Sequence, residues 1–207
     1  MNSLRFIKSY VKRLAAARRD LSQGSIKNCH ARGVYSILLR EDPIERLFVT
    51  TPEHEMWAVD EHDVPATIAF HSHHCDLRLE TIRGEFANVT WTRAGREFRF
   101  AGYMFDSKIM GGDGKFLPLG PTVYHDRAPL RQVVDAGQRV VMGASEIHSV
   151  LVPKGEVAAW LVTEADEDPN YSPIAWSTQD LTRFDAEGLY LPMTDSEALG
   201  IVESALS

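Results

Sequence analysis

Cysteine is scarce in this sequence of 207 residues, which contains only Cys29 and Cys75. Two thiols cannot build the disulfide framework that stabilises small secreted domains, and their scarcity fits a reducing, cytoplasmic compartment. Long hydrophobic runs are also lacking, since no stretch approaches the roughly 18 apolar residues of a membrane-spanning helix. The composition therefore predicts a cytoplasmic protein with no membrane association.

Positive charge is in deficit, and the net charge is −7. An acidic protein is a poor match for the phosphate backbone of nucleic acid, so no nucleic-acid partner is predicted. The sequence also lacks a dinucleotide-binding fingerprint, a nucleophile elbow and zinc-finger spacing. The glycine-rich run at 111–114 lacks the spacing of a phosphate-binding loop.

The positive charge that is present gathers at the start of the chain. Residues 1–22 hold six of the 22 basic side chains and one of the 29 acidic ones. Apolar residues recur there at helical spacing, which predicts a helix over 3–21 that ends near Gly24. The segment shares its basic, amphipathic character with organellar transit peptides. A helix that lies on the acidic body of the protein, and that could take part in a homodimer, is the simpler interpretation.

Most of the chain has the pattern of short strands. From residue 46 onward, short apolar or alternating runs are separated by turn residues, which is typical of an antiparallel sandwich or barrel. The runs lie at 46–51, 55–59, 65–71, 73–82, 85–92, 96–104, 121–125, 130–134, 138–142, 147–152 and 157–163. We therefore expect an N-terminal helical extension over 1–45, a barrel over 46–163, and an irregular C-terminal segment over 164–207.

A segment on each side of the expected barrel has a recognisable pattern of its own. Residues 29–40 could form a short helix or a buried strand, because their apolar positions fit both periods. The C-terminal segment is expected to end in a short helix, since Thr194 and Glu197 have the spacing of a capping box.

The most informative pattern is the pair His71 and His73. Alternate residues of a strand point to the same face, so both imidazoles would face one side and could bind one metal ion. Cys75 would share that face, as a small buried side chain or as a redox-sensitive wall of a pocket. His74 and Glu80 would face the other way. A third ligand must then come from elsewhere in the chain.

These residues resemble the first motif of the cupin superfamily. That motif is a His-x-His pair, three or four residues, a Glu, six residues and a Gly, and the span from His71 to Gly84 has the shorter spacing. The second cupin motif places a Gly eleven residues before a His, as Gly137 and His148 are placed. The resemblance implies an all-β, cupin-type double-stranded β-helix (jelly-roll) barrel, with His148 as the third metal ligand.

The sequence departs from the family at the glutamate of the first motif, which is Leu77 here. In this respect it resembles the thiol dioxygenase branch, in which three histidines hold iron(II). Neutral imidazoles leave the ion its full charge and open positions, where a small substrate such as a thiol and dioxygen could bind side by side. Imidazole ligands also suit Zn or Ni, and Mn is a further option, so the preference for Fe(II) comes from the resemblance.

Other side chains are candidates for a role near the metal. Glu146 would share the face of His148 if the strand has already begun there. It could be a ligand, orient an imidazole or act as a base, or be an acid at a strand end. His125 could exchange protons near neutral pH, and Tyr124 could place a phenol near bound oxygen, although a loop position and core packing explain them as well. Three arginines could clamp a substrate carboxylate or be surface charges: Arg46, Arg99 and Arg127. The sequence offers no partner for His30 or His54.

The sequence therefore favours a metal-dependent cupin enzyme, an iron(II) dioxygenase acting on a small substrate. Two alternatives stay open. One is a cupin that binds or senses a small ligand without turning it over. The other is a Zn or Mn isomerase or hydrolase in which Glu146 acts as base.

Overall fold

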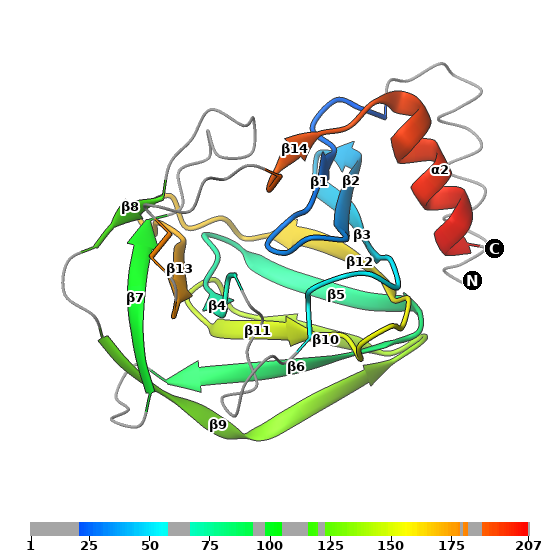
Figure 1. Cartoon of the computed structure of the whole chain (residues 1–207). Coiled ribbons are helices and arrows are strands. Elements are labelled where there is room, and N and C mark those ends of the chain that lie inside the picture. Colours follow the sequence, from blue (N-terminus) through cyan, green and yellow to red (C-terminus); the bar gives the residue numbers. More distant parts are fainter. Residues whose placement is uncertain are drawn as a thin grey trace.

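The computed structural model describes residues 21–57, 67–92, 98–104, 116–119, 123–178, 180–181 and 188–206, with the backbone alone at 98–99, 123–130 and 206. Within these ranges the regular secondary structure is fourteen strands and one helix (Figure 1). They are β1 (Ile26–Lys27), β2 (Val34–Glu41), β3 (Ile44–Thr50), β4 (Phe70–His71), β5 (Asp76–Arg83), β6 (Glu85–Thr92), β7 (Phe98–Met104), β8 (Leu117–Pro118), β9 (Val123–Asp135), β10 (Arg139–Met142), β11 (Ile147–Leu151), β12 (Ala159–Ala165), β13 (Ile174–Ser177) and β14 (Leu191–Pro192), followed by the helix α2 (Asp195–Leu206).

The strands form two antiparallel sheets. Sheet A has the order β10-β5-β12-β3-β2-β1-β14, and sheet B has the order β13-β4-β11-β6-β9-β7-β8. Sheet B curls back on itself, because β13 pairs with both β4 and β7. Strands that are consecutive along the chain repeatedly lie in different sheets, as β4 and β5 do. This alternation of the chain between two antiparallel sheets confirms the expected all-β, cupin-type barrel.

Strand alternation gives sheet A two different faces. On β3, Leu47 and Val49 join an apolar cluster that includes residues of α2, so the helix covers the outer face. Arg46 and Phe48, which alternate with them, line a cavity on the inner face. The main core therefore lies between the two sheets, where Leu79 of sheet A belongs to the same cluster as residues of sheet B.

A further apolar cluster, which includes four aromatic side chains, lies on the other face of sheet B. Phe70 stacks on Trp91 with ring centroids 4.5 Å apart and on Trp176 at 5.4 Å. Phe100 meets Phe70 edge to face at 4.6 Å. Each such pair stabilises the fold by about 0.5–1.5 kcal/mol beyond the contribution of its buried area. Because Phe70 is fixed on this face, the next residue, His71, is directed toward the cavity.

Two glycines of the sequence motifs make the turns that the barrel needs. Gly84, between β5 and β6, has φ +67°, and Gly137, between β9 and β10, has φ +87°. A side chain at Gly84 would also meet the carbonyl oxygen of Val157 at 2.5 Å. Other residues rarely adopt this backbone conformation, and at Gly84 they would also collide with the chain.

Several expectations at the chain ends can be compared with the structure. The helix expected over 3–21 lies outside the described residues, except at its last position. The ambiguous segment 29–40 contains the strand β2, and β2 pairs with β3, so strand pairing crosses the expected boundary at residue 46. In the same way β13 and β14, from the expected C-terminal segment, pair within sheets B and A.

The strand predictions need several corrections. Of the expected runs 65–71 and 73–82, the described residues 67–69 and 73–75 lie outside strands, because β4 holds only Phe70–His71 and β5 begins at Asp76. Residues 55–57 are not in a strand. The Met56 N–H donates to His54 Nδ1 and the Met56 carbonyl oxygen accepts from the Val152 N–H, so these groups do not join the hydrogen-bond ladder of a sheet. The runs 121–125 and 130–134 were expected as separate strands, and the structure joins them from 123 onward in the single strand β9.

The C-terminal helix α2 begins at the predicted capping box. The Thr194 hydroxyl accepts from the Glu197 N–H at 3.3 Å, and the Glu197 carboxylate accepts from the Thr194 N–H at 2.8 Å. Such caps contribute about 1 kcal/mol. With 12 residues, α2 is too short to cross a bilayer, and the described residues contain no helix that is long and apolar enough to do so.

Candidate metal centre

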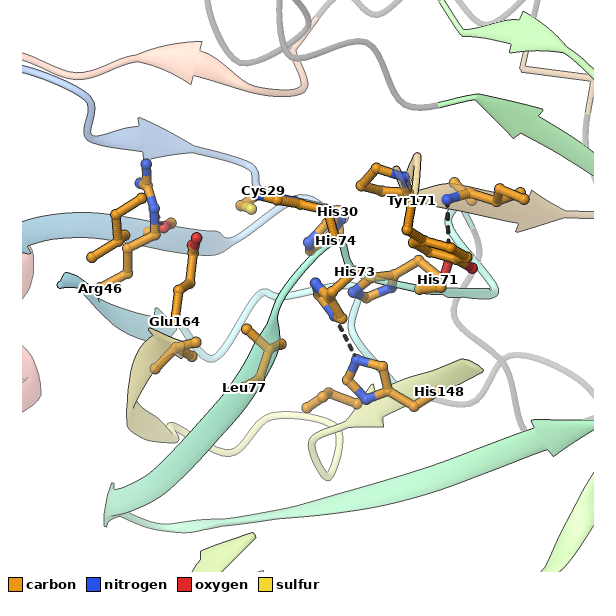
Figure 2. A pocket seen from close by; sticks show the side chains of 18 of the residues that line it. Cys29, His30, Arg46, His71, His73, His74, Leu77, His148, Glu164 and Tyr171 are labelled. Atoms are coloured by element: carbon orange, nitrogen blue, oxygen red, sulfur yellow. Dashed lines mark hydrogen bonds between the residues drawn. The ribbon is translucent and has the colours of Figure 1, made fainter. Parts of the chain in front are cut away.

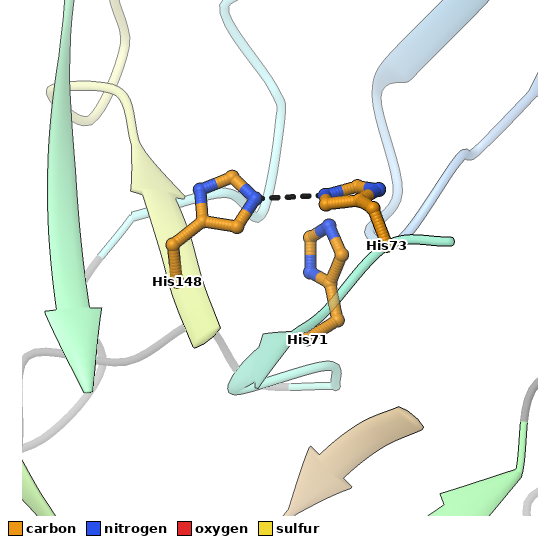
Figure 3. Close-up of side chains that lie close together, drawn as sticks. All are labelled: His71, His73 and His148. Carbon is orange, nitrogen blue, oxygen red and sulfur yellow. Dashed lines mark hydrogen bonds between the residues drawn. The ribbon is translucent and has the colours of Figure 1, made fainter. Parts of the chain in front are cut away.

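Strand pairing in sheet B places two histidines side by side. His71 ends β4, His148 lies in β11, and the two are direct partners in the antiparallel register. Directly opposed residues point to the same face, so both imidazoles enter the cavity. His73 follows β4, where its N–H donates to the Ala144 carbonyl oxygen at 3.0 Å and fixes the backbone. The structure thus brings the three predicted ligands together (Figure 3).

The geometry of the three imidazoles fits a single metal ion. Their ring centroids lie 4.7–5.1 Å apart, and one ring nitrogen from each lies within 4.8 Å of the others. His73 Nε2 and His148 Nε2 are 2.9 Å apart. Metal–nitrogen bonds of about 2.1 Å place neighbouring ligand nitrogens about 3 Å apart, so this separation suits coordination.

Burial keeps these imidazoles neutral. It lowers the pKa of His148 to about 3, with a smaller contribution from the nearby His30. The pKa values of His71 and His73 lie well below the usual range, chiefly because of burial and further because of the neighbouring imidazoles. Neutral imidazoles have the free lone pairs that a metal ion needs, so the cluster is ready to bind a cation at neutral pH.

Asn88 fixes the orientation of His148. His148 Nδ1 lies 2.8 Å from Asn88 Oδ1, and because that amide oxygen can only accept, Nδ1 carries the proton and the Nε2 lone pair faces the cluster. The sequence analysis missed this residue. The signal that could have found it is an amide among the apolar residues of β6, next to Ala87 and Val89.

Replacing Asn88 with alanine is expected to weaken metal binding about 10- to 100-fold, the usual effect of losing the acceptor behind a ligand. Asn88→Asp is the matched control, since its carboxylate also accepts from Nδ1, and it should bind almost as tightly as the native protein. Calorimetric titration of both variants with Co²⁺ measures the difference. Equal affinities for the alanine and native proteins would contradict this role.

His30 is a second residue that the sequence analysis missed. Its ring stacks on His71 with centroids 4.4 Å apart, and its Nδ1 lies 2.9 Å from the hydroxyl of Tyr190. Burial lowers the pKa of His30 to about 4. Because Tyr190 is 160 residues away along the chain, no local pattern could have indicated this contact.

Of the other predicted site residues, Glu146 is described and is not at the cluster. Glu146 lies in the turn before β11, where its N–H donates to the Gly143 carbonyl oxygen, and it is not among the described residues that line the cavity. Because the strand begins only at Ile147, the expected shared face with His148 does not arise. Tyr124 and His125 belong to β9, as the strand expected over 121–125 places them, so His125 is not in a loop. Their side chains lie outside the described residues. Catalytic roles for the three stay predictions.

Cys75 is buried beside a carboxylate rather than beside the three imidazoles. Its Sγ lies 3.7 Å from Glu164 Oε2. Burial, followed by the charge of Glu164, raises the pKa of this thiol to about 12. Cys29 is also buried, and burial raises its pKa to about 12. Both cysteines are therefore thiols at neutral pH.

The cluster opens into a cavity of about 660 Å³ between the two sheets (Figure 2). Its wall includes the apolar side chains of Leu77, Leu79 and Val150. Arg46 lies at the opposite end of the labelled lining from His71 in Figure 2. Of the three candidate arginines, Arg46 alone is described as part of the wall, because the side chains of Arg99 and Arg127 lie outside the described residues.

The strand pairing and the three-histidine cluster define a cupin-type β-barrel with a candidate centre for a divalent metal. No protein-family model matches the chain, and no curated protein matches it. Among solved structures, it is similar to the hydroxypropylphosphonic acid epoxidase from S. wedmorenis, at 12% identity and a TM-score of 0.39. That match covers 68% of this chain and only 54% of the epoxidase.

The cupin domain of Drosophila melanogaster CENP-C is also similar, at 12% identity and a TM-score of 0.35, over 66% of this chain and 73% of that one. The Fe(II) form of HppE matches at 10% identity and a TM-score of 0.34, over 65% of this chain and 52% of that one. The fold assignment rests on the strand pairing described above.

Proposed function

We propose that this protein is an iron(II)-dependent dioxygenase for a small molecule, in which His71, His73 and His148 hold the ion. The observation that carries the proposal is the convergence of three neutral imidazoles, one buried and two half-buried, at the wall of a cavity of about 660 Å³. Imidazoles that served packing alone would not need an adjoining space of the size that small-molecule sites have.

Bound iron(II) would supply the redox chemistry and, with only three protein ligands, would have positions left for substrate and dioxygen. The residues of the chain have other tasks. Asn88 holds the His148 ring in one tautomer, which keeps its Nε2 directed at the ion. Leu77, Leu79 and Val150 give the cavity an apolar wall that limits the entry of water.

Arg46 gives the cavity a place for an acidic group. Its Nη1 donates to the Gly24 carbonyl oxygen at 2.8 Å and more weakly to Ser36 Oγ at 3.4 Å. Within the described residues, its Nε and Nη2 have no hydrogen-bond partner. A guanidinium with free donors in a partly apolar wall favours a carboxylate. We therefore extend the proposal to a small acidic substrate, of which a thiol carboxylate is one example.

The proposal is tested by measuring bound metal and oxygen uptake on the same sample. Protein loaded anaerobically with Fe²⁺ should hold iron and consume oxygen when small thiols and carboxylic acids are screened. Zinc-loaded protein is the control and should consume none. Protein that binds no metal at the cluster would support a binding or sensing role. Turnover with zinc or manganese but without oxygen uptake would support an isomerase or hydrolase.

Arg46→Met is expected to raise the KM of the most active acidic compound in that screen about 10- to 100-fold. The reason is the loss of a charge-assisted hydrogen bond, which is worth about 1.5–3 kcal/mol. Arg46→Lys keeps the charge, so its KM should lie between those of the native protein and Arg46→Met. The methyl ester of the same compound should show no such dependence on residue 46, and an equal KM increase for acid and ester would refute a carboxylate contact.

A further inference from the structure

We propose that His74, Cys75 and Glu164 form a second metal site, distinct from the three-histidine centre, that binds a thiophilic divalent ion such as zinc. Each side chain offers one ligand atom, and these atoms all lie within 4.8 Å of one another. The donors are an imidazole, a thiol and a carboxylate, and all three are common zinc ligands.

Two distant segments build this site. His74 and Cys75 lie between β4 and β5, and Glu164 lies near the end of β12. Glu164 is the register partner of Leu77 on β5, which places it beside the start of that strand. Antiparallel pairing therefore brings the carboxylate to the cysteine, and Cys75 Sγ lies 3.7 Å from Glu164 Oε2.

Hydrogen bonds fix the chain around these ligands independently of any ion. The Asp168 N–H donates to the His74 carbonyl oxygen at 2.6 Å, so the chain after β12 is tied to the chain before β5. On the other side, the Ala144 N–H donates to Asp76 Oδ1 at 2.9 Å. A metal ion would thus find its ligands already assembled, and little conformational entropy would be lost when it binds.

A fourth ligand is within reach. Glu167 Oε1 lies 3.7 Å from His74 Nε2, and its side chain is 68% exposed, so it can turn toward an ion. Cys75 is buried, whereas the His74 side chain is 40% exposed and leaves a route from solvent. The set would then be Cys, His and two carboxylates, which suits the four-coordinate geometry of zinc.

The two centres differ in charge and therefore in preference. Three neutral imidazoles leave a divalent ion its full charge, whereas the thiolate of Cys75 and the carboxylate of Glu164 neutralise it, and Glu167 would add one more negative charge. When the ion binds Cys75, the S–H bond breaks, a metal–sulfur bond forms and the proton leaves to water. A thiolate favours zinc or cobalt over harder ions such as magnesium. An ion here would join the segment that carries His73 to the end of β12.

Cobalt is a suitable probe, because Co²⁺ bound to a thiolate shows a sulfur-to-metal charge-transfer absorption that imidazole ligands do not give. We expect the metal-free protein, kept reduced with a phosphine, to bind two equivalents of Co²⁺ and to show this absorption. Cys75→Ala should bind one equivalent without the absorption. Cys29→Ala removes the other buried thiol and is the matched control, which should retain both.

Two more variants keep the test decisive. His148→Ala should lose the equivalent of Co²⁺ at the three-histidine centre and retain the charge-transfer absorption. The two centres are therefore tested separately, and failure of the proposed function is distinguishable from failure of this site. His74→Ala changes a partly exposed side chain and serves to check Cys75→Ala for folding defects. His74→Ala should weaken the binding of the Co²⁺ equivalent that gives the absorption at least 10-fold. A single equivalent in the native protein without the absorption, or an absorption that survives in Cys75→Ala, would overturn the proposal.

Discussion

Replacing His148 with alanine is expected to reduce iron at the three-histidine centre to less than about a tenth of the native level and to abolish iron-dependent oxygen uptake. Losing the acceptor behind a ligand already costs 10- to 100-fold in affinity, and losing the ligand itself costs more. Two imidazoles would remain, from His71 and His73, without the partner whose Nε2 lies 2.9 Å from that of His73.

His54→Ala is the matched control for this substitution. His54 is equally buried, and its ring accepts from the Met56 N–H at 3.0 Å, but it belongs to neither metal cluster. This variant should lose stability and retain iron. Iron content is measured by elemental analysis of anaerobically loaded protein, and folding by circular dichroism. Native iron content in His148→Ala, or an equal loss in His54→Ala, would remove His148 from the ligand set.

The metal-free protein is expected to lose stability steeply between pH 7.5 and 5.5. Burial lowers the pKa of His148 to about 3 and that of His30 to about 4, and it holds those of His71 and His73 well below 6.5. In the unfolded chain these groups titrate near 6.5. Below that pH the unfolded state binds more protons than the folded state, so the free energy of unfolding falls as the pH falls.

The expected loss is large because the four histidines act in the same direction. A fully buried histidine contributes about 1.4 kcal/mol over this range, so the four contribute about 3–5 kcal/mol after allowing for partial exposure of three of them. This is a large share of a typical stability of 5–15 kcal/mol. Urea unfolding at several pH values measures it.

His148→Gln provides the comparison, since it removes one of the titrating groups and should reduce the mean slope over this range by about half a proton. A free energy of unfolding that stays constant between pH 7.5 and 5.5 would show that the imidazoles are not held neutral by burial.

The paired histidines illustrate what local sequence can reveal. His71 and His73 are two residues apart, and such neighbours in an extended segment lie on one face whatever the rest of the chain does. Their rings are 4.7 Å apart, as that spacing predicts. The glycines at 84 and 137 are equally local signals, because their turns need a backbone conformation that other residues rarely adopt.

The strands and the capping box were also accessible to sequence reasoning, since alternation and side-chain spacing act within a few residues. Errors arose where a segment made hydrogen bonds to a distant part of the chain. Residues 55–57 look like a strand, yet the Met56 carbonyl oxygen accepts from Val152, and β2 could not be assigned until its pairing with β3 was seen.

The sequence by itself determined the all-β architecture, the His-x-His pair and the absence of a disulfide framework, because periodicity and composition act over short distances. Only the tertiary structure decided that His148 stands opposite His71, that Asn88 fixes its ring, that His30 stacks on the cluster and that Cys75 meets Glu164. Each of these contacts joins residues that are 41 to 89 positions apart, and no local pattern encodes which distant segments meet. For His71 and His148 the register between strands sets the contact.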